Sequence, residues 1–161
     1  MARTDTTGTL ACTSFNSLAS STTTGMAESV VRTTSTTANI SDTQVRVTVT
    51  VGAITPSAIT FVAVYAYAAL DTTWPGGAAT NEVIDGTDKA LTVSSFGNGL
   101  RFLGTILAHT ASIAHTSEPL SIGQAFGGTV PAKWGIVIQN QTGVALAASG
   151  NSVGYDEISF A

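Results

Sequence analysis

The segment QVRVTVTV, Gln44–Val51, decides the fold class of this chain. Valine occupies every second position, from Val45 to Val51, and arginine or threonine fills the positions between. Successive side chains of a β-strand point to opposite faces, so this alternation predicts a strand with one apolar and one solvated face. The pattern favours a sheet that packs on a core through one side.

Other segments of the chain also have strand patterns, and turn residues separate them. Short strands at this spacing, with no long helix to cover a parallel sheet, predict an all-β fold. We expect an antiparallel β-sandwich, jelly-roll-like, with about eight strands. Leu120–Phe126 alone favours a short helical turn, ended by Gly127-Gly128. The other expected strands are Val30–Thr37, Ile59–Leu70, Leu91–Ser94, Leu100–Ala108, Trp134–Gln139, Val144–Ala148 and Val153–Phe160.

Composition agrees with a β fold in one domain. Only 10% of the residues are charged, and threonine with serine supplies about a quarter of the chain, which suits the solvent face of a sheet. Residues 1–29 are polar and show no sustained period, so we expect an N-terminal arm or edge segment. Residues 30–161 then form a single sandwich domain.

Charge and hydropathy argue against several classes of partner. The net charge is −4 and the six basic residues are scattered, which disfavours direct binding to nucleic acid. The most apolar run, Ile59–Leu70, has about twelve residues against the roughly 20 that cross a bilayer, so no membrane partner is expected. The N-terminus lacks the apolar run of an export signal. The single cysteine allows no internal disulfide.

One motif resembles the nucleophile elbow of hydrolases. Gly150–Gly154 matches G-x-S-x-G around Ser152, but an elbow needs a helix after the serine and a histidine further along the chain. A strand pattern follows Ser152, and both histidines precede it. The adjacent carboxylates Asp156 and Glu157 would point to opposite faces of a strand, unlike a glycosidase pair. We therefore predict a turn, no catalytic residue and no enzyme.

Three further groups of residues allow binding roles. His109, His115 and Glu118 are compatible with a metal site but lack the ligands to close it, so solvated loop residues are the simpler interpretation. The acidic loop Asp71–Asp88 allows a bound cation, but a solvated turn is the default interpretation. Trp74, in a loop, suits an interface with a protein, a contact with a glycan or local packing. No cofactor is expected.

The segment KWGIVIQNQTGV, Lys133–Val144, predicts the central hairpin. Trp134 opens an apolar strand, and Asn140–Gly143 would turn it into a partner strand from Val144. Asn140-Gln141-Thr142 is formally a glycosylation acceptor, as is Asn39-Ile40-Ser41. Without an export signal we expect neither to be used.

Several segments together resemble small structural proteins of tailed bacteriophage virions. The resemblance runs from Phe15 to the C-terminus, and its most specific part is FGGTVPAKWGIVIQNQTG, from Phe126 to Gly143. Its other parts are FNSLASSTTTGMAESVV, VAVYAYAALD, LRFLGTI and SEPLSIGQA.

The resemblance implies a virion protein that is made in the host cytoplasm and built into the capsid surface. Among virion roles we expect a capsid decoration (cement) protein, which binds the major capsid protein across capsomer boundaries and stabilises the shell. A tail or head-fibre component is the alternative within phage biology, and a carbohydrate-binding module is the alternative of another class. We also expect a homo-oligomer. Expected exposure selects the interface candidates Phe15, Leu18, Trp74, His109, His115 and Glu118.

Overall fold

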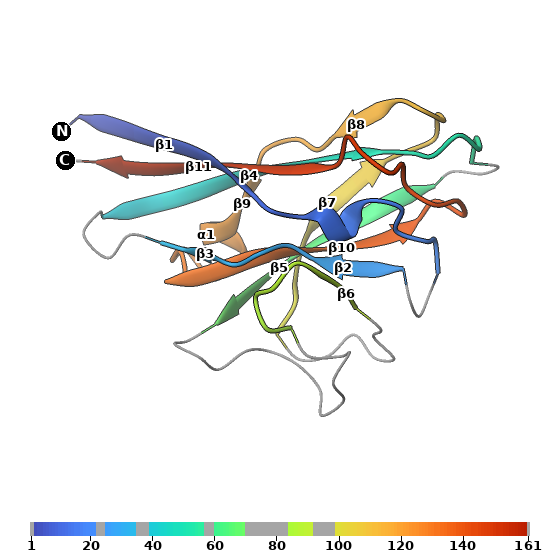
Figure 1. Ribbon diagram of the computed structural model, residues 1–161. Helices are drawn as coiled ribbons and strands as arrows, with labels where there is room; N and C mark the ends of the chain where they lie inside the picture. Colours follow the sequence, from blue (N-terminus) through green and yellow to red (C-terminus); the bar gives the residue numbers. More distant parts are fainter. Residues whose placement is uncertain are drawn as a thin grey trace.

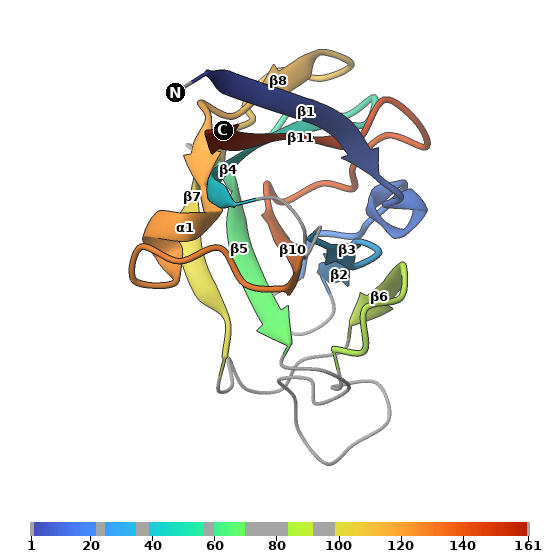
Figure 2. The same cartoon turned by 90° about the vertical axis from the view of Figure 1, so that its left-hand side faces the viewer.

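The computed structural model describes residues 2–21, 25–34, 39–56, 60–69, 84–91 and 99–160. They form two facing antiparallel sheets, so the predicted antiparallel β-sandwich is confirmed (Figures 1 and 2). Sheet A has the order β1-β11-β4-β8, and β9 also pairs with β4. Sheet B has the order β6-β2-β10-β5-β7, and β3 also pairs with β10.

The described residues contain eleven strands, of which five have only two or three residues. The long strands are β1 (Arg3–Leu10), β4 (Ile40–Thr50), β5 (Phe61–Ala69), β7 (Arg101–Leu107), β10 (Lys133–Gln141) and β11 (Ser152–Phe160). The short strands are β2 (Met26–Glu28), β3 (Arg32–Thr33), β6 (Lys89–Leu91), β8 (Ala114–Thr116) and β9 (Leu120–Ser121). Two helical turns, η1 (Thr13–Phe15) and α1 (Ile122–Ala125), complete the fold, and no helix among these residues is long and apolar enough to cross a membrane.

Strand β4 confirms the alternation read from the sequence. Val45, Val47, Val49 and Val51 are all 0% exposed, and they face sheet B across the sandwich. The core between the sheets also contains Trp134 and Phe15, both fully buried. Burial of these large side chains contributes about 25 cal/mol for each Å² of apolar surface removed from water, the main stabilising contribution for a chain whose only cysteine is unpaired.

The expected hairpin after β10 is wrong. Strand β10 pairs with β5, β2 and β3, and in the segment 144–148 only Leu146 forms a bridge, to Val51 of the other sheet. The turn itself is confirmed: the Asn140 Oδ1 atom accepts hydrogen bonds from the Thr142 N–H at 3.1 Å and its hydroxyl at 2.7 Å. The Asn140 Nδ2 atom donates to the carbonyls of Leu18 and Val144. These bonds fix a turn that leads to sheet A instead of back along sheet B.

The N-terminal segment is part of both sheets. Strand β1 is an edge strand of sheet A, paired with β11 over its full length from Arg3↔Phe160 to Leu10↔Val153. Strand β2 lies inside sheet B, between β6 and β10. The expectation of an edge segment is therefore met by β1, whereas the expectation of a free arm is wrong for the described residues. Strand β1 has exposed threonines on both faces. Its sequence therefore lacks the apolar alternation of a half-buried strand and resembles an unstructured arm.

A salt bridge joins the two sheets at one side of the core. Arg32 of β3 donates to both oxygens of the Glu157 carboxylate in β11, at 2.9 Å from Nε and 2.8 Å from Nη2. The Arg32 guanidinium lies 4.9 Å from the centre of the Tyr155 ring, and Tyr155 packs edge-on against Trp134. A two-pronged pair of this kind fixes geometry as well as charge. It sets the distance between β3 and β11.

Candidate functional site

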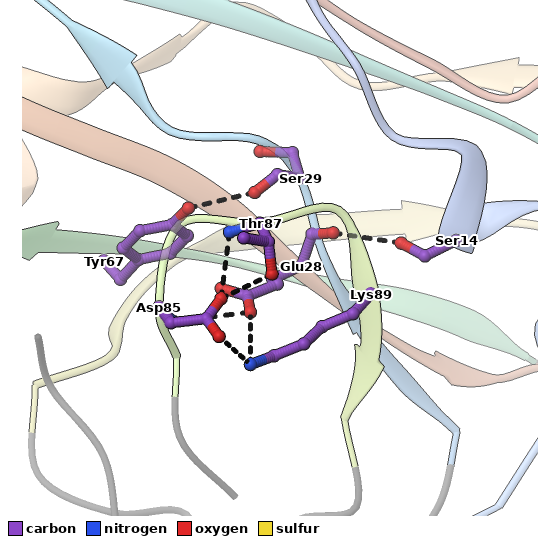
Figure 3. Close-up of polar contacts among 7 residues, drawn as sticks. All are labelled: Ser14, Glu28, Ser29, Tyr67, Asp85, Thr87 and Lys89. Carbon is purple, nitrogen blue, oxygen red and sulfur yellow. Dashed lines mark hydrogen bonds and ion pairs between the residues drawn. The ribbon is translucent and has the colours of Figure 1, made fainter. Parts of the chain in front are cut away.

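The most unusual cluster of charge lies on the face of sheet B that points away from sheet A. Here the segment Ile84–Leu91, which we call the strap, packs against β2 and β5 (Figure 3). Ile84 and Leu91 are 5% and 1% exposed and form a second apolar cluster with Met26, Tyr67 and Val137. The strap also carries three charged residues, Asp85, Asp88 and Lys89. They contact two different parts of the chain.

Gly135 of β10 makes room for the ring of Tyr67. A Cβ atom at this position would lie within 2.3 Å of the Tyr67 ring and hydroxyl. The ring therefore lies directly over β10, and its hydroxyl donates to the Ser29 carbonyl at 2.9 Å. Burial is the main cause that raises the pKa of Tyr67 above its ordinary value. The phenol is thus neutral and forms an apolar wall beside Glu28 (Figure 3).

Glu28 of β2 is a carboxylate that is 0% exposed and poorly paired. Its Oε1 atom lies 3.4 Å from Lys89 Nζ and 3.5 Å from the Asp85 N–H, and its Oε2 atom has no hydrogen-bond partner. Burial, the largest effect, raises the pKa of Glu28 from 4.5 to about 7, against the lowering effect of the Lys89 cation. This side chain therefore changes charge near neutral pH.

Lys89 is shared between two carboxylates and lies closer to the other one. Its Nζ atom is 2.6 Å from Asp85 Oδ2, and Asp85 also accepts hydrogen bonds from the Thr87 N–H and hydroxyl. Burial acts to raise the pKa of Asp85, but the hydrogen bonds from Lys89 and Thr87 outweigh it and lower the value to about 2. The ammonium is thus held mainly by Asp85, and its interaction with Glu28 is the weaker of the two.

Asp88 ties the strap to the N-terminal turn η1. Its carboxylate accepts hydrogen bonds from the Thr13 N–H at 2.6 Å, the Thr13 hydroxyl at 2.5 Å and the Ser14 N–H at 2.8 Å. Although burial acts to raise it, these bonds hold the pKa of Asp88 below its ordinary value. Both aspartates of Asp85–Asp88 are thus occupied by donors of the chain itself, an arrangement that leaves little of either carboxylate for a cation.

The six interface candidates differ in how far they are exposed to solvent. The exposure expected for Phe15 and Leu18 is wrong, because they are 0% and 5% exposed and belong to the core. Trp74 lies outside the described residues, as do Asp71 and Glu82 of the acidic loop. Glu118 and His109 are exposed and His115 is half-buried. The two histidine rings lie together, with centres 5.5 Å apart. Within the described ranges, no three His, Cys, Asp or Glu residues gather as metal ligands do.

Ser152 has the surroundings of a strand residue. It begins β11 and is exposed, and the turn before it contains Gly150 with a φ of +85°. A nucleophile elbow would place the serine between a strand and a helix, so the prediction of a turn is confirmed. Asp156 and Glu157 do face opposite sides of β11, because Glu157 is 2% exposed in the core and Asp156 lines a groove on the outside of sheet A.

His109 lies at one end of the sandwich, which we call the loop end, and His115 follows it in strand β8. The loop end consists of residues 51–56, 108–113 and 142–150, opposite the end where both termini lie (Figure 1). The Ser112 N–H donates to the carbonyls of Val51 and Gly52, and the Gly52 N–H donates to Ala145, so the three loops are bonded together. Ile54 and Ile113 are 70% and 52% exposed here, and Leu107, where β7 reaches this end, is 61% exposed.

The fold defines an all-β sandwich protein, and its two distinctive places are the strap with Glu28 and the loop end with exposed apolar side chains. Comparisons of the chain with known protein families, with curated proteins and with solved structures found no match in any of the three. The predictions from the sequence included the acidic loop Asp71–Asp88 and His109, but they missed Glu28 and the exposed isoleucines. Glu28 gives no signal because its partners are about 60 residues away in the chain, and the exposed isoleucines look like any other apolar residues in a β pattern.

Proposed function

We propose that this chain is a structural protein of a tailed-bacteriophage particle, a capsid decoration protein whose loop end binds the outer shell formed by the major capsid protein. The sequence resemblance supports the virion role. The fold supports the virion role as well. Side-chain packing stabilises the sandwich without a disulfide, because the only cysteine of the chain is unpaired. A binding role requires a surface that is available in the free protein, and the loop end is the best candidate.

The observation that carries the proposal is the exposure of large apolar side chains at the loop end. Ile54, Leu107 and Ile113 each leave more than half of their surface in water. Single exposed apolar residues are common, but several of them at one end of a small domain are typical of a protein interface. Hydrogen bonds between the loops hold this end in one shape, so little ordering cost accompanies binding.

Purified particles test the role directly. A decoration protein is expected in many copies, comparable with the major capsid protein, and on the outer face of the shell in an imaged particle. Shells without it are expected to release their contents at a lower temperature, because a ligand that binds only the assembled shell stabilises it by mass action. About six or twelve copies at one vertex or along the tail would assign the chain to the tail instead. Its absence from particles would end the virion proposal.

Substitutions at the two ends of the sandwich test the binding surface. We expect the double variant Ile54→Ser/Ile113→Ser to occupy shells at least about tenfold less than the wild type, since each buried apolar side chain contributes roughly 1 to 2 kcal/mol. Phe160→Ser is the matched control, because Phe160 is 43% exposed at the opposite end. An equal loss of shell occupancy in the double variant and in Phe160→Ser would contradict binding through the loop end. Full occupancy by the double variant would contradict it as well.

A carbohydrate-binding module is the second candidate, and a groove on the outside of sheet A favours it. The groove has a volume of about 420 Å³ and is lined by Gln44, Arg46 and Asp156 around Gly154. Amide, guanidinium and carboxylate groups bind sugar hydroxyls by paired hydrogen bonds. A glycan array that retains the wild type but not Arg46→Ala would favour this function. No retention of the wild type would exclude it for the sugars on the array.

A further inference from the structure

The strap covers the carboxyl group of Glu28. Ionisation of this group is unfavourable as long as the strap keeps water away from it. Glu28 lies opposite Lys89 in the pairing of β2 with β6 and opposite Val137 in the pairing of β2 with β10. The Glu28 side chain is 0% exposed, and one of its two oxygens has no partner. Contact with water lowers the free energy of an ionised carboxylate that is buried in this way.

Among the described residues, few groups face Glu28, and none of them neutralises it fully. From β6 comes Lys89, whose ammonium lies 3.4 Å from Glu28 and 2.6 Å from Asp85. The strap also contributes Asp85, a second negative charge, and β5 contributes the neutral phenol of Tyr67. In the part of the chain that the structure describes, β10 presents Val137 at this position, which has no charge. The Asp85 carboxylate competes with Glu28 for the same cation.

We propose that the strap Ile84–Leu91 is a pH-sensitive latch on sheet B, which is closed while Glu28 is protonated and opens more readily once Glu28 is ionised. Opening would lift the short edge strand β6 from β2 and bring water to the Glu28 carboxylate. It would also release Asp88 from Thr13 and Ser14, because Asp88 is the residue before β6. The latch therefore couples the ionisation of one buried side chain to the N-terminal turn η1.

The sign of the effect follows from proton linkage. When the strap is closed, the pKa of Glu28 is about 7, and when water reaches the side chain it returns toward 4.5. Opening then releases a proton between these values, so the equilibrium constant for opening rises by up to about tenfold per pH unit in this window. The constant does not change below pH 4.5 and levels off above pH 7, with a total rise of at most about three-hundredfold.

Amide hydrogen exchange of the whole chain between pH 4 and 8 measures this constant, once the intrinsic pH dependence of exchange is removed. We expect the Lys89, Ala90 and Leu91 amides to open more often than the Val45 to Val49 amides of β4 at every pH. Their opening constant is expected to rise by up to about three-hundredfold across the window. In Glu28→Gln, which keeps the shape and removes the charge, the same amides are expected to show no rise.

A second variant keeps the test informative if Glu28→Gln folds poorly. Asp85→Asn removes the competitor for Lys89 and one negative charge near Glu28, so the pKa of Glu28 in the closed strap is expected to fall. The rise is then expected to level off at lower pH and to be smaller than in the wild type. The latch is wrong if the rise persists in Glu28→Gln, or if the wild type shows none. It is also wrong if β6 and β4 share one opening constant at every pH, because Glu28 would then titrate only with global unfolding.

Discussion

Glu157 and Glu28 are two glutamates that are equally removed from water and differently partnered. Glu157 is 2% exposed and receives two hydrogen bonds under 3 Å from Arg32. Glu28 is 0% exposed, its two contacts are 3.4 and 3.5 Å long, and one oxygen has none. The geometry of the partner therefore decides what a buried carboxylate contributes to stability. One glutamate fixes the distance between the sheets, and the other makes the strap sensitive to pH.

Arg32 and Lys89, the cations beside the two glutamates, differ in how they bind a carboxylate. The Arg32 guanidinium lies 4.9 Å from the centre of the Tyr155 ring, which packs edge-on against the buried Trp134. Its rigid fork matches both oxygens of a carboxylate. The Lys89 ammonium is a single point of charge on a flexible stem, and Asp85 holds it at 2.6 Å. A partly exposed competitor thus takes the cation that Glu28 needs.

The largest expected effect on stability comes from breaking the pair between Arg32 and Glu157. Arg32→Ala leaves the Glu157 carboxylate buried without its partner, so we expect the free energy of unfolding to fall by about 3 kcal/mol at pH 7. Denaturant unfolding measures this change. Arg101→Ala is the control, because Arg101 is exposed, and it is expected to change stability by less than about 0.5 kcal/mol. A loss in Arg32→Ala as small as in the control would remove the contrast between the two glutamates.

The second effect is the pH dependence of stability. The pKa of Glu28 is raised in the folded chain, so its contribution is fully present below pH 4.5 and is lost as the pH rises through about 7. We expect the free energy of unfolding to fall by about 2 kcal/mol across this window, somewhat less than the full shift implies. Glu28→Gln is expected to lack this fall and to exceed the wild type in stability at pH 8. The opposite order at pH 8 would show that the ionised carboxylate is well paired.

A smaller effect is expected from Asp88→Ala. This change removes three hydrogen bonds to η1, at a partly exposed site, so the expected loss is about 1 kcal/mol at pH 7. Because the pKa of Asp88 is lowered in the folded chain, this contribution is present above pH 4 and is lost at lower pH. Thermal unfolding at pH 7 and pH 2.5 separates the two conditions. Asp5→Ala is the matched control, since Asp5 pairs with Arg3 on the exposed surface of β1.

The smallest effect is expected from Lys89→Met. The shared ammonium lowers the pKa of Glu28 only in part, so its removal is expected to move the Glu28 titration to higher pH and to cost less than about 1 kcal/mol at pH 5. Carboxyl titration by NMR follows the shift. A shift to lower pH would mean that Lys89 does not act on Glu28 as its position indicates.

The sequence predicts those parts of the fold that depend on local pattern. The alternation from Val45 to Val51 gives β4 and its buried face, and Gly127-Gly128 gives the end of α1. The partners of each strand depend on distant residues. Strand β10 meets β2 and β5 instead of the segment after its turn, because Asn140 directs the chain to the other sheet. The partners of Glu28 are hidden for the same reason.

The most direct test of the contrast between the two glutamates is the titration of the Glu28 carboxyl carbon by NMR in the intact chain. The structure predicts a midpoint near pH 7, because burial outweighs the distant Lys89. A midpoint near 4.5, the ordinary value for this side chain, would mean that Glu28 is solvated or fully paired and would contradict both the contrast and the latch.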